Sequence, residues 1–123
     1  MRIINWFEIP VTDMARAKAF YQAVFQVELK DEDCSTTGGK MSLFPYSEEH
    51  TGGALCQMEH MVPSATGSLL YLNAGDDLLP YLARAEKAGG SVIMPRLLLS
   101  EEIGAIAVMR DSEGNHIGLH STR

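Results

Sequence analysis

The sequence has few cysteines, few basic residues and no long apolar run. Its two cysteines, Cys34 and Cys56, do not form a CxxC pair, and in a reducing compartment two unrelated thiols are favoured over one disulfide. No stretch approaches the roughly 20 apolar residues that span a bilayer, and the amino-terminal residues lack the charged region and apolar core of a secretion signal. We therefore expect a cytoplasmic protein with no membrane partner.

Basic residues are outnumbered by acidic ones, 10 to 16, which gives a net charge of -6. Nucleic acids and anionic membranes select basic surfaces, so we expect neither as the main partner. The sequence also lacks an HExxH motif, a nucleophile elbow and a paired-cysteine zinc pattern. The 123 residues, of which 46% are hydrophobic, instead suit an ordinary globular domain.

The predicted elements follow one order twice. A strand is followed by a helix and then by three further strands, and Pro and Gly mark a connector near the middle. The two units cover residues 1–59 and 67–121, joined by a connector at 60–66. The predicted strands lie at 3–11, 27–30, 41–44, 54–58, 68–74, 92–94, 105–109 and 115–120, and the helices begin near Asp13 and Asp77. This order predicts an α+β fold of two βαβββ modules that form a cupped mixed sheet with both helices outside.

The first strand has two different faces because successive side chains of a strand point in opposite directions. The predicted core face carries Ile3, Phe7, Ile9 and Val11. The predicted cavity face carries Ile4, Trp6, Glu8 and Pro10. Glu8 is the only acidic group on its face, and a covered carboxylate needs a partner or a ligand. The alternative is that Glu8 lies near the strand end, open to water. Trp6 is placed either to stack on a flat ligand or simply to pack.

The last strand alternates in the same way. Ile117 and Leu119 are predicted to face a helix, while His116, Gly118 and His120 share the face that lines the cavity. Our hypothesis is that Glu8 and His120 meet in this cavity, or reach one ligand, as a catalytic carboxylate–imidazole pair. The alternative is a structural Glu and His that satisfy each other or water.

Three segments carry a resemblance to a known family. They are Phe7-Glu8-Ile9-Pro10-Val11-Thr12-Asp13-Met14-Ala15-Arg16-Ala17-Lys18-Ala19-Phe20-Tyr21, Gly75-Asp76-Asp77-Leu78 with Ala88-Gly89-Gly90, and Asp111-Ser112-Glu113-Gly114-Asn115. With them the chain resembles the vicinal oxygen chelate superfamily, which contains glyoxalase I, bleomycin-resistance proteins and extradiol dioxygenases, and is most similar to its stand-alone glyoxalase-like proteins. The resemblance implies paired βαβββ modules. It also implies a homodimer, because members commonly share their sheets across a dimer.

The resemblance further implies where a metal would be bound. Enzymes of the superfamily hold a divalent metal with His, Gln or Glu from the first and last strand of each module. Those positions correspond here to Trp6, Leu70, Gly118 and either Ala54 or Cys56, and Trp, Leu and Gly offer no ligand atoms. We therefore predict no cofactor and no metal. The predicted ligand-binding residues are Trp6, Cys56, Leu70, His116 and Gly118. A relocated metal site made from Glu8, Cys56, His116 and His120 is the alternative.

Three functions are compatible with this sequence. The leading one is a small-molecule binding protein of the drug-resistance type that has lost the usual metal site. The second is a metal-dependent glyoxalase-like lyase or isomerase with relocated ligands. The third is a regulatory or accessory subunit whose cavity is vestigial.

Overall fold

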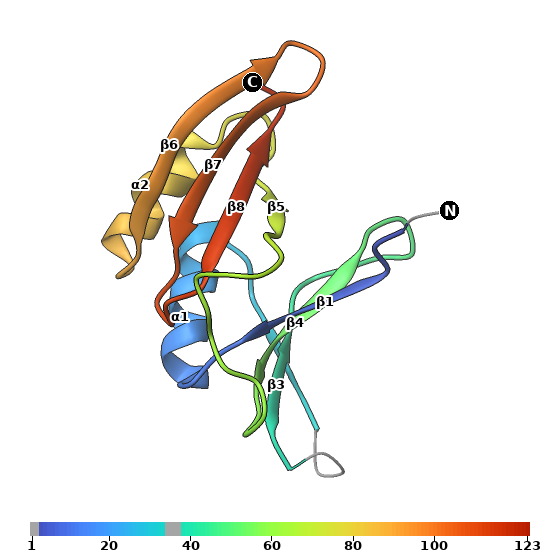
Figure 1. Ribbon diagram of the computed structural model, residues 1–123. Coiled ribbons are helices and arrows are strands. Elements are labelled where there is room, and N and C mark those ends of the chain that lie inside the picture. Colours follow the sequence, from blue (N-terminus) through green and yellow to red (C-terminus); the bar gives the residue numbers. More distant parts are fainter. Residues whose placement is uncertain (1–2, 34–37) are drawn as a thin grey trace.

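The two predicted modules form two separate sheets in the computed structural model, which describes residues 3–33 and 38–123. The elements are β1 (Trp6–Pro10), α1 (Met14–Phe25), β2 (Lys30–Glu32), β3 (Lys40–Leu43), β4 (Gly52–Gln57), β5 (Tyr71–Asn73), α2 (Leu79–Lys87), β6 (Ser91–Ser100), β7 (Gly104–Arg110) and β8 (His116–Ser121), shown in Figure 1. The predicted order of strand, helix and three strands, occurring twice, is confirmed. Cys34 lies outside the described residues.

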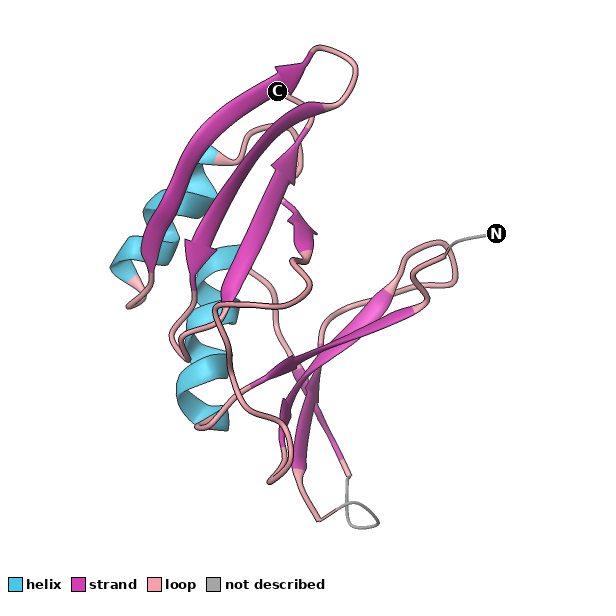
Figure 2. Ribbon diagram, in the orientation of Figure 1, coloured by secondary structure: helices cyan, strands magenta, loops and turns pink. Residues whose placement is uncertain are grey.

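Both sheets have the same strand order. The first is β1-β4-β3-β2 and the second is β5-β8-β7-β6. In each, the first strand of the module pairs parallel with the last, and the other pairings are antiparallel. The two sheets diverge from the region around α1 (Figure 1), and both helices lie on one side of them (Figure 2). The predicted α+β fold of paired βαβββ modules is confirmed.

Several predicted strand limits are wrong. The first strand begins at Trp6, so Ile3 precedes it and is 95% exposed instead of lying in the core. The second strand lies at Lys30–Glu32 instead of 27–30. Strand β6 has 10 residues, whereas the predicted strand covers only 92–94. Register shifts interrupt the pairing of β6 with β7, and they hide the strand alternation in the sequence.

Helix α1 begins and ends where its local chemistry predicts. Asp13 has an extended backbone, and its carboxylate accepts a hydrogen bond from the Arg16 amide at 3.1 Å, which satisfies one free amide of the first turn. Gln26 ends the helix in the left-handed conformation, with φ of 54°. The buried residues recur at helical spacing and are Met14, Ala17, Phe20, Tyr21 and Val24. This stripe packs α1 into the core.

One hydrophobic core serves both modules. It contains Ile9 and Leu55 of the first module and Leu82 and Leu119 of the second, all of them buried. The predicted inward positions Ile117 and Leu119 of β8 are 4% and 0% exposed. Neither helix within 3–33 and 38–123 is long and apolar enough to cross a membrane.

The turn between β7 and β8 ties the second module to the first. Asp111 is buried, and its carboxylate accepts hydrogen bonds from the Tyr21 hydroxyl at 2.6 Å and from the Asn115 side-chain amide at 3.0 Å. The same Asn115 amide group donates to the Pro10 carbonyl at 2.7 Å. Gly114 has a φ of 95°, which glycine adopts without strain. The turn thereby contacts both α1 and the end of β1.

Glu113 of this turn forms a polar contact between the modules with several partners. Its side chain is fully covered and accepts from the Thr12 amide at 2.8 Å and the Asp13 amide at 2.9 Å, while the Arg16 guanidinium lies 2.6 Å away. Burial acts to raise the pKa of Glu113, but the bonds from Arg16, Asp13 and Thr12 outweigh it and lower the pKa from 4.5 to about 2. The ionised form is therefore favoured in the folded state.

We predict that Glu113→Gln lowers the free energy of unfolding by about 2 kcal/mol at neutral pH. A pKa lowered from 4.5 to about 2 corresponds to roughly 3 kcal/mol, and screening around Arg16, 52% exposed, reduces this value. Because the pKa of Glu113 is lower in the folded state, its contribution to the free energy of unfolding is fully present above the unfolded-state pKa. This contribution is lost as the pH falls through the folded-state pKa. Urea unfolding at several pH values measures this.

The control for this prediction is Glu86→Gln, which alters an exposed carboxylate of α2. It should change the free energy of unfolding little at any pH. The difference between the wild type and Glu113→Gln should shrink as the pH falls from 4.5 towards 2. A difference that stays constant across this range would contradict the assignment.

Candidate functional site

A cavity of about 410 Å³ lies where the two modules meet. Its walls come from β1, from the connector and from the start of β8. The lining residues are Ile4, Trp6, Phe7, Glu8, Ile9, Pro10, Val62, Ser64, Thr66, Ser68, Leu70, Asn115, His116 and Ile117. This mixture of apolar walls and a few polar groups is typical of small-molecule sites.

Trp6 and Glu8 lie at the exposed side of this cavity. Trp6 is 42% exposed, and its indole N–H donates to a Glu8 carboxylate oxygen at 3.3 Å. Glu8 is also exposed, which agrees with the alternative that it is open to water and not with a covered carboxylate. The ring of Tyr46 stands nearly perpendicular to that of Trp6, at 6.3 Å between centroids. Strand alternation in β1 therefore places an aromatic ring and a carboxylate side by side.

His116 enters the cavity from the start of β8. Its backbone amide donates to the Ser64 carbonyl at 3.4 Å, and the Ser64 amide donates to the Asn115 side chain at 3.0 Å. These bonds hold the connector against β8. They also bring Ser64, Thr66 and Ser68 to the cavity wall. The sequence does not identify Ser64 and Thr66 as lining, because the connector has no periodicity that would orient its side chains. Ser68 lies at the start of the predicted strand 68–74 and is not singled out either.

His120 lies outside this cavity. Its Nε2 atom is 2.6 Å from the Ile103 carbonyl oxygen, at the turn between β6 and β7. The ring nitrogen that bonds there carries a proton, because a carbonyl oxygen only accepts. Glu8 instead accepts from Trp6. The structure thus places Glu8 and His116 in the lining of one cavity, whereas the described hydrogen bonds of Glu8 and His120 go to other partners.

The other predicted ligand-binding residues divide between the cavity and the sheet interiors. Leu70 lines the cavity. Gly118 is buried beneath the Tyr71 ring, which a Cβ at that position would approach to 2.4 Å. Cys56 is 0% exposed and pairs in register with Pro10 and Met41 on neighbouring strands. Gly118 and Cys56 are therefore not among the residues that line the cavity.

The metal implied by the resemblance does not fit these residues. Trp6, Leu70 and Gly118 supply no metal-binding side-chain atom at the corresponding positions. Within the part of the chain that the structure describes, no three or more His, Cys, Asp or Glu side chains form a group that could hold a metal ion. The donors proposed for a relocated site are also separated, since Glu8 and His116 line the cavity whereas Cys56 and His120 do not.

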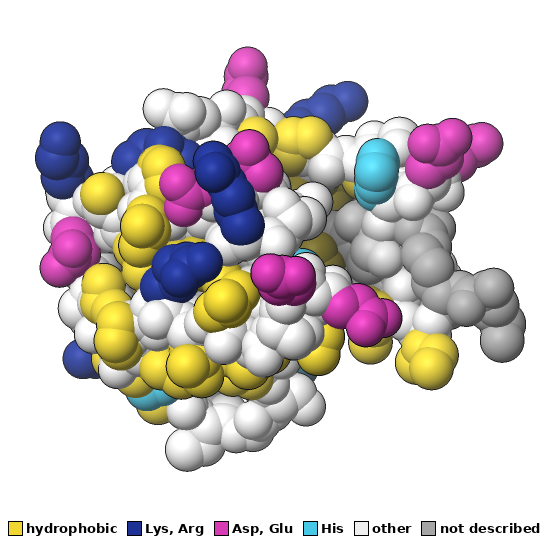
Figure 3. Space-filling model, turned by 90° about the horizontal axis from the view of Figure 1, so that it is seen from above, with side chains coloured by type: hydrophobic (Ala, Val, Ile, Leu, Met, Phe, Trp, Pro, Cys, Tyr) yellow, Lys and Arg dark blue, Asp and Glu magenta, His cyan; other side chains and the backbone are white. Residues whose placement is uncertain are grey.

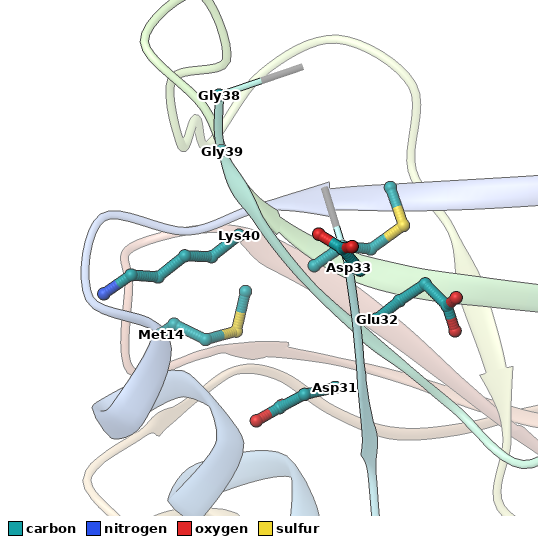
Figure 4. A pocket seen from close by; sticks show the side chains of 8 residues that line it. Met14, Asp31, Glu32, Asp33, Gly38, Gly39 and Lys40 are labelled. Atoms are coloured by element: carbon teal, nitrogen blue, oxygen red, sulfur yellow. The ribbon is translucent and has the colours of Figure 1, made fainter. Parts of the chain in front are cut away.

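A second hollow, of about 430 Å³, lies at the other edge of the first sheet, where Asp31, Lys40 and Met14 point towards it (Figure 4). Asp31 already accepts from Lys18 at 2.9 Å and from the Ser42 hydroxyl at 3.0 Å. The hydrogen bond from Lys18, followed by that from Ser42, lowers the pKa of Asp31. Because this carboxylate has structural partners and no aromatic residue appears among the described lining, we favour the cavity at the module seam.

Comparisons with known proteins agree with this architecture. Solved structures that match include a glyoxalase I mutant from Zea mays, with a TM-score of 0.72 and 18% identity over 95% of this chain and 45% of that one. A hypothetical protein from S. aureus matches with a TM-score of 0.69 and 18% identity over 98% and 95% of the chains. The fosfomycin resistance protein FosX from Listeria monocytogenes matches with a TM-score of 0.66 and 14% identity over 98% and 91%. At these identities the likeness concerns the fold.

The chain spans less than half the length of the maize glyoxalase I chain that it matches. No curated protein matches the sequence. The family model described as Glyoxalase/Bleomycin resistance protein/Dioxygenase superfamily matches residues 3–119. The chain therefore belongs to the glyoxalase/bleomycin resistance protein/dioxygenase superfamily.

Proposed function

We propose that this chain binds a small molecule in the cavity at the module seam, and that it does so without the metal used by enzymes of its superfamily. The observation that carries this proposal is the meeting of Trp6, Glu8, Leu70 and His116 in one cavity. They come from β1, from the segment before β5 and from β8, so the fold and not the local sequence brings them together. In this proposal the apolar walls bury the ligand while Glu8, His116 and the hydroxyls of the connector orient it.

The pairing of Glu8 with His120 as a catalytic pair stays a prediction. It requires His120 to leave the Ile103 carbonyl, to which it lies within hydrogen-bonding distance at 2.6 Å. His116 lines the same cavity as Glu8 and needs no such change. We therefore propose His116 as the imidazole that contacts the ligand.

We predict that benzyl alcohol, a neutral aromatic probe, binds saturably in the presence of EDTA. Trp6 is the only tryptophan, so its fluorescence reports binding in the cavity. Loss of one hydrogen bond is worth about 1 kcal/mol, so His116→Ala should weaken binding of the probe about fivefold. His120→Ala is the matched control and should leave the affinity unchanged.

Two results would contradict this proposal. One is the absence of saturable binding by any aromatic probe to the folded protein. The other is binding that appears only after a divalent metal is supplied, which would favour the glyoxalase-like enzyme with relocated ligands. A loss of affinity in His120→Ala but not in His116→Ala would identify His120 as the imidazole that contacts the ligand.

We also propose that the protein is a homodimer. Its accessible surface is 7553 Å², whereas a monomeric protein of its 13.5 kDa mass is expected to expose about 6500 Å². The excess is similar to the roughly 800 Å² that each partner buries in a standard interface. This surface supports association with a second copy.

The β6–β7 hairpin is the face that we propose for this dimer. Its half-exposed apolar side chains are Ile93, Leu97, Leu98, Leu99 and Ile103. Figure 3 looks onto this end of the molecule, and hydrophobic side chains gather at the left of the view. Successive side chains of β6 point to alternate sides, so both sides of the hairpin carry exposed apolar groups, and such exposure favours contact with another chain.

We predict that Leu97→Glu converts the dimer to monomer at micromolar concentration. Leu97 is 49% exposed, so the change should not disturb folding, whereas a carboxylate buried in the interface would lack a partner. Sedimentation velocity measures the change. Leu79→Glu on α2 is the control, since Leu79 is equally exposed at 52% and lies on another element. A wild type that sediments as a monomer would refute the proposed dimer.

A further inference from the structure

Trp6, at the exposed side of the cavity, forms a corner with the ring of Tyr46, which adjoins Trp6 and is not itself among the described lining residues. The planes of Trp6 and Tyr46 meet at 88°, with 6.3 Å between ring centroids. Both rings lie over Gly52, where a Cβ would be 3.0 Å from Trp6 and 3.1 Å from Tyr46. Both also remain accessible, at 42% and 62% exposure. A glycine in β4 therefore leaves room for two aromatic walls that solvent can reach.

A carboxylate lies beside this corner. Glu8 accepts one hydrogen bond from the Trp6 indole at 3.3 Å, and a carboxylate can accept several more. Apart from Glu8 and His116, the lining residues of the cavity within 3–33 and 38–123 are apolar or neutral. The described part of the cavity therefore favours a positive charge over a negative one.

We propose that Trp6, Tyr46 and Glu8 bind a substituted ammonium group, so that the ligand of the cavity is an amphipathic organic cation. This inference rests on the proposed function and names the class of its ligand. A cation over an aromatic face is attracted by the negative potential of the ring, most strongly for tryptophan. Glu8 adds Coulombic attraction, and it accepts charge-assisted hydrogen bonds where the ammonium group carries N–H.

The shape of the corner agrees with this class of ligand. Two perpendicular rings enclose a compact, rounded group better than a flat one, and a methylated ammonium group is compact. The apolar lining of the cavity, which includes Ile4, Pro10 and Leu70, provides a surface for the hydrocarbon part of the same ligand. An anionic ligand would meet repulsion from Glu8 at the exposed side of the cavity.

The test compares three probes that share a benzyl or phenyl group and differ in charge: benzyltrimethylammonium, benzyl alcohol and benzoate. Each is titrated against the wild type while Trp6 fluorescence is recorded, and calorimetry checks the affinities. We expect the cation to bind at least about fivefold more tightly than the alcohol, and benzoate to bind most weakly. Raising the salt concentration should weaken only the binding of the cation.

Two variants separate the contributions of the corner. Glu8→Gln should weaken binding of benzyltrimethylammonium about threefold to fivefold. It should weaken binding of benzyl alcohol less, because the amide keeps a hydrogen-bond acceptor and removes only the charge. Tyr46→Leu should likewise reduce the preference for the cation, because it keeps an apolar side chain and removes one ring. Glu86→Gln, which removes an exposed negative charge on α2, is the control and should change neither affinity.

The outcomes distinguish this inference from the proposed function. If benzyl alcohol binds and the cation binds no more tightly, or if Glu8→Gln weakens both probes equally, the ammonium site is refuted while the small-molecule site remains. If no probe binds to the folded wild type, the proposed function fails and the ammonium site fails with it.

Discussion

The carboxylate of Glu113 is the constraint on which the arrangement of the two modules depends. It lies at the amino-terminal end of α1, where it accepts hydrogen bonds from two backbone amides and is 2.6 Å from the guanidinium of Arg16. A buried carboxylate without these donors would be strongly unfavourable, so the turn and the helix end must stay together. The same turn supplies Asp111 to the buried hydroxyl of Tyr21. The motif Asp111 to Asn115 is therefore a structural joint between modules.

Asn115 connects this joint to the cavity. Its side chain donates to the Pro10 carbonyl at the end of β1 and accepts from the Ser64 amide of the connector. Both segments contribute to the walls of the cavity, and Asn115 itself is one of the lining residues. The distance between Glu8 and His116 is consequently set by the bonds that hold the modules together. A change in the turn should therefore alter the cavity as well as the stability.

The fold was predictable because its signals are local. The repeated order of strand, helix and three strands identified the two modules, and the helices predicted to begin near Asp13 and Asp77 begin at Met14 and Leu79. Alternation gives only the face of a strand, however, and not the position along it that a cavity reaches. For this reason the sequence did not distinguish His116 from His120. The connector residues Ser64 and Thr66 carry no periodic signal, and Tyr46 lies in a loop, so the sequence identified none of them.

The bonds between Glu113 and the segment at Thr12 and Asp13 join residues 101 and 100 positions apart. Contacts of such separation close a large loop, which costs entropy and slows folding. During synthesis the first module emerges long before Glu113 exists, so the amino-terminal end of α1 acquires its anion only after β1 to β7 have been made. The first sheet must then persist, or form again, while the second is being added. The two modules accordingly acquire their final arrangement only after the turn between β7 and β8 has been made.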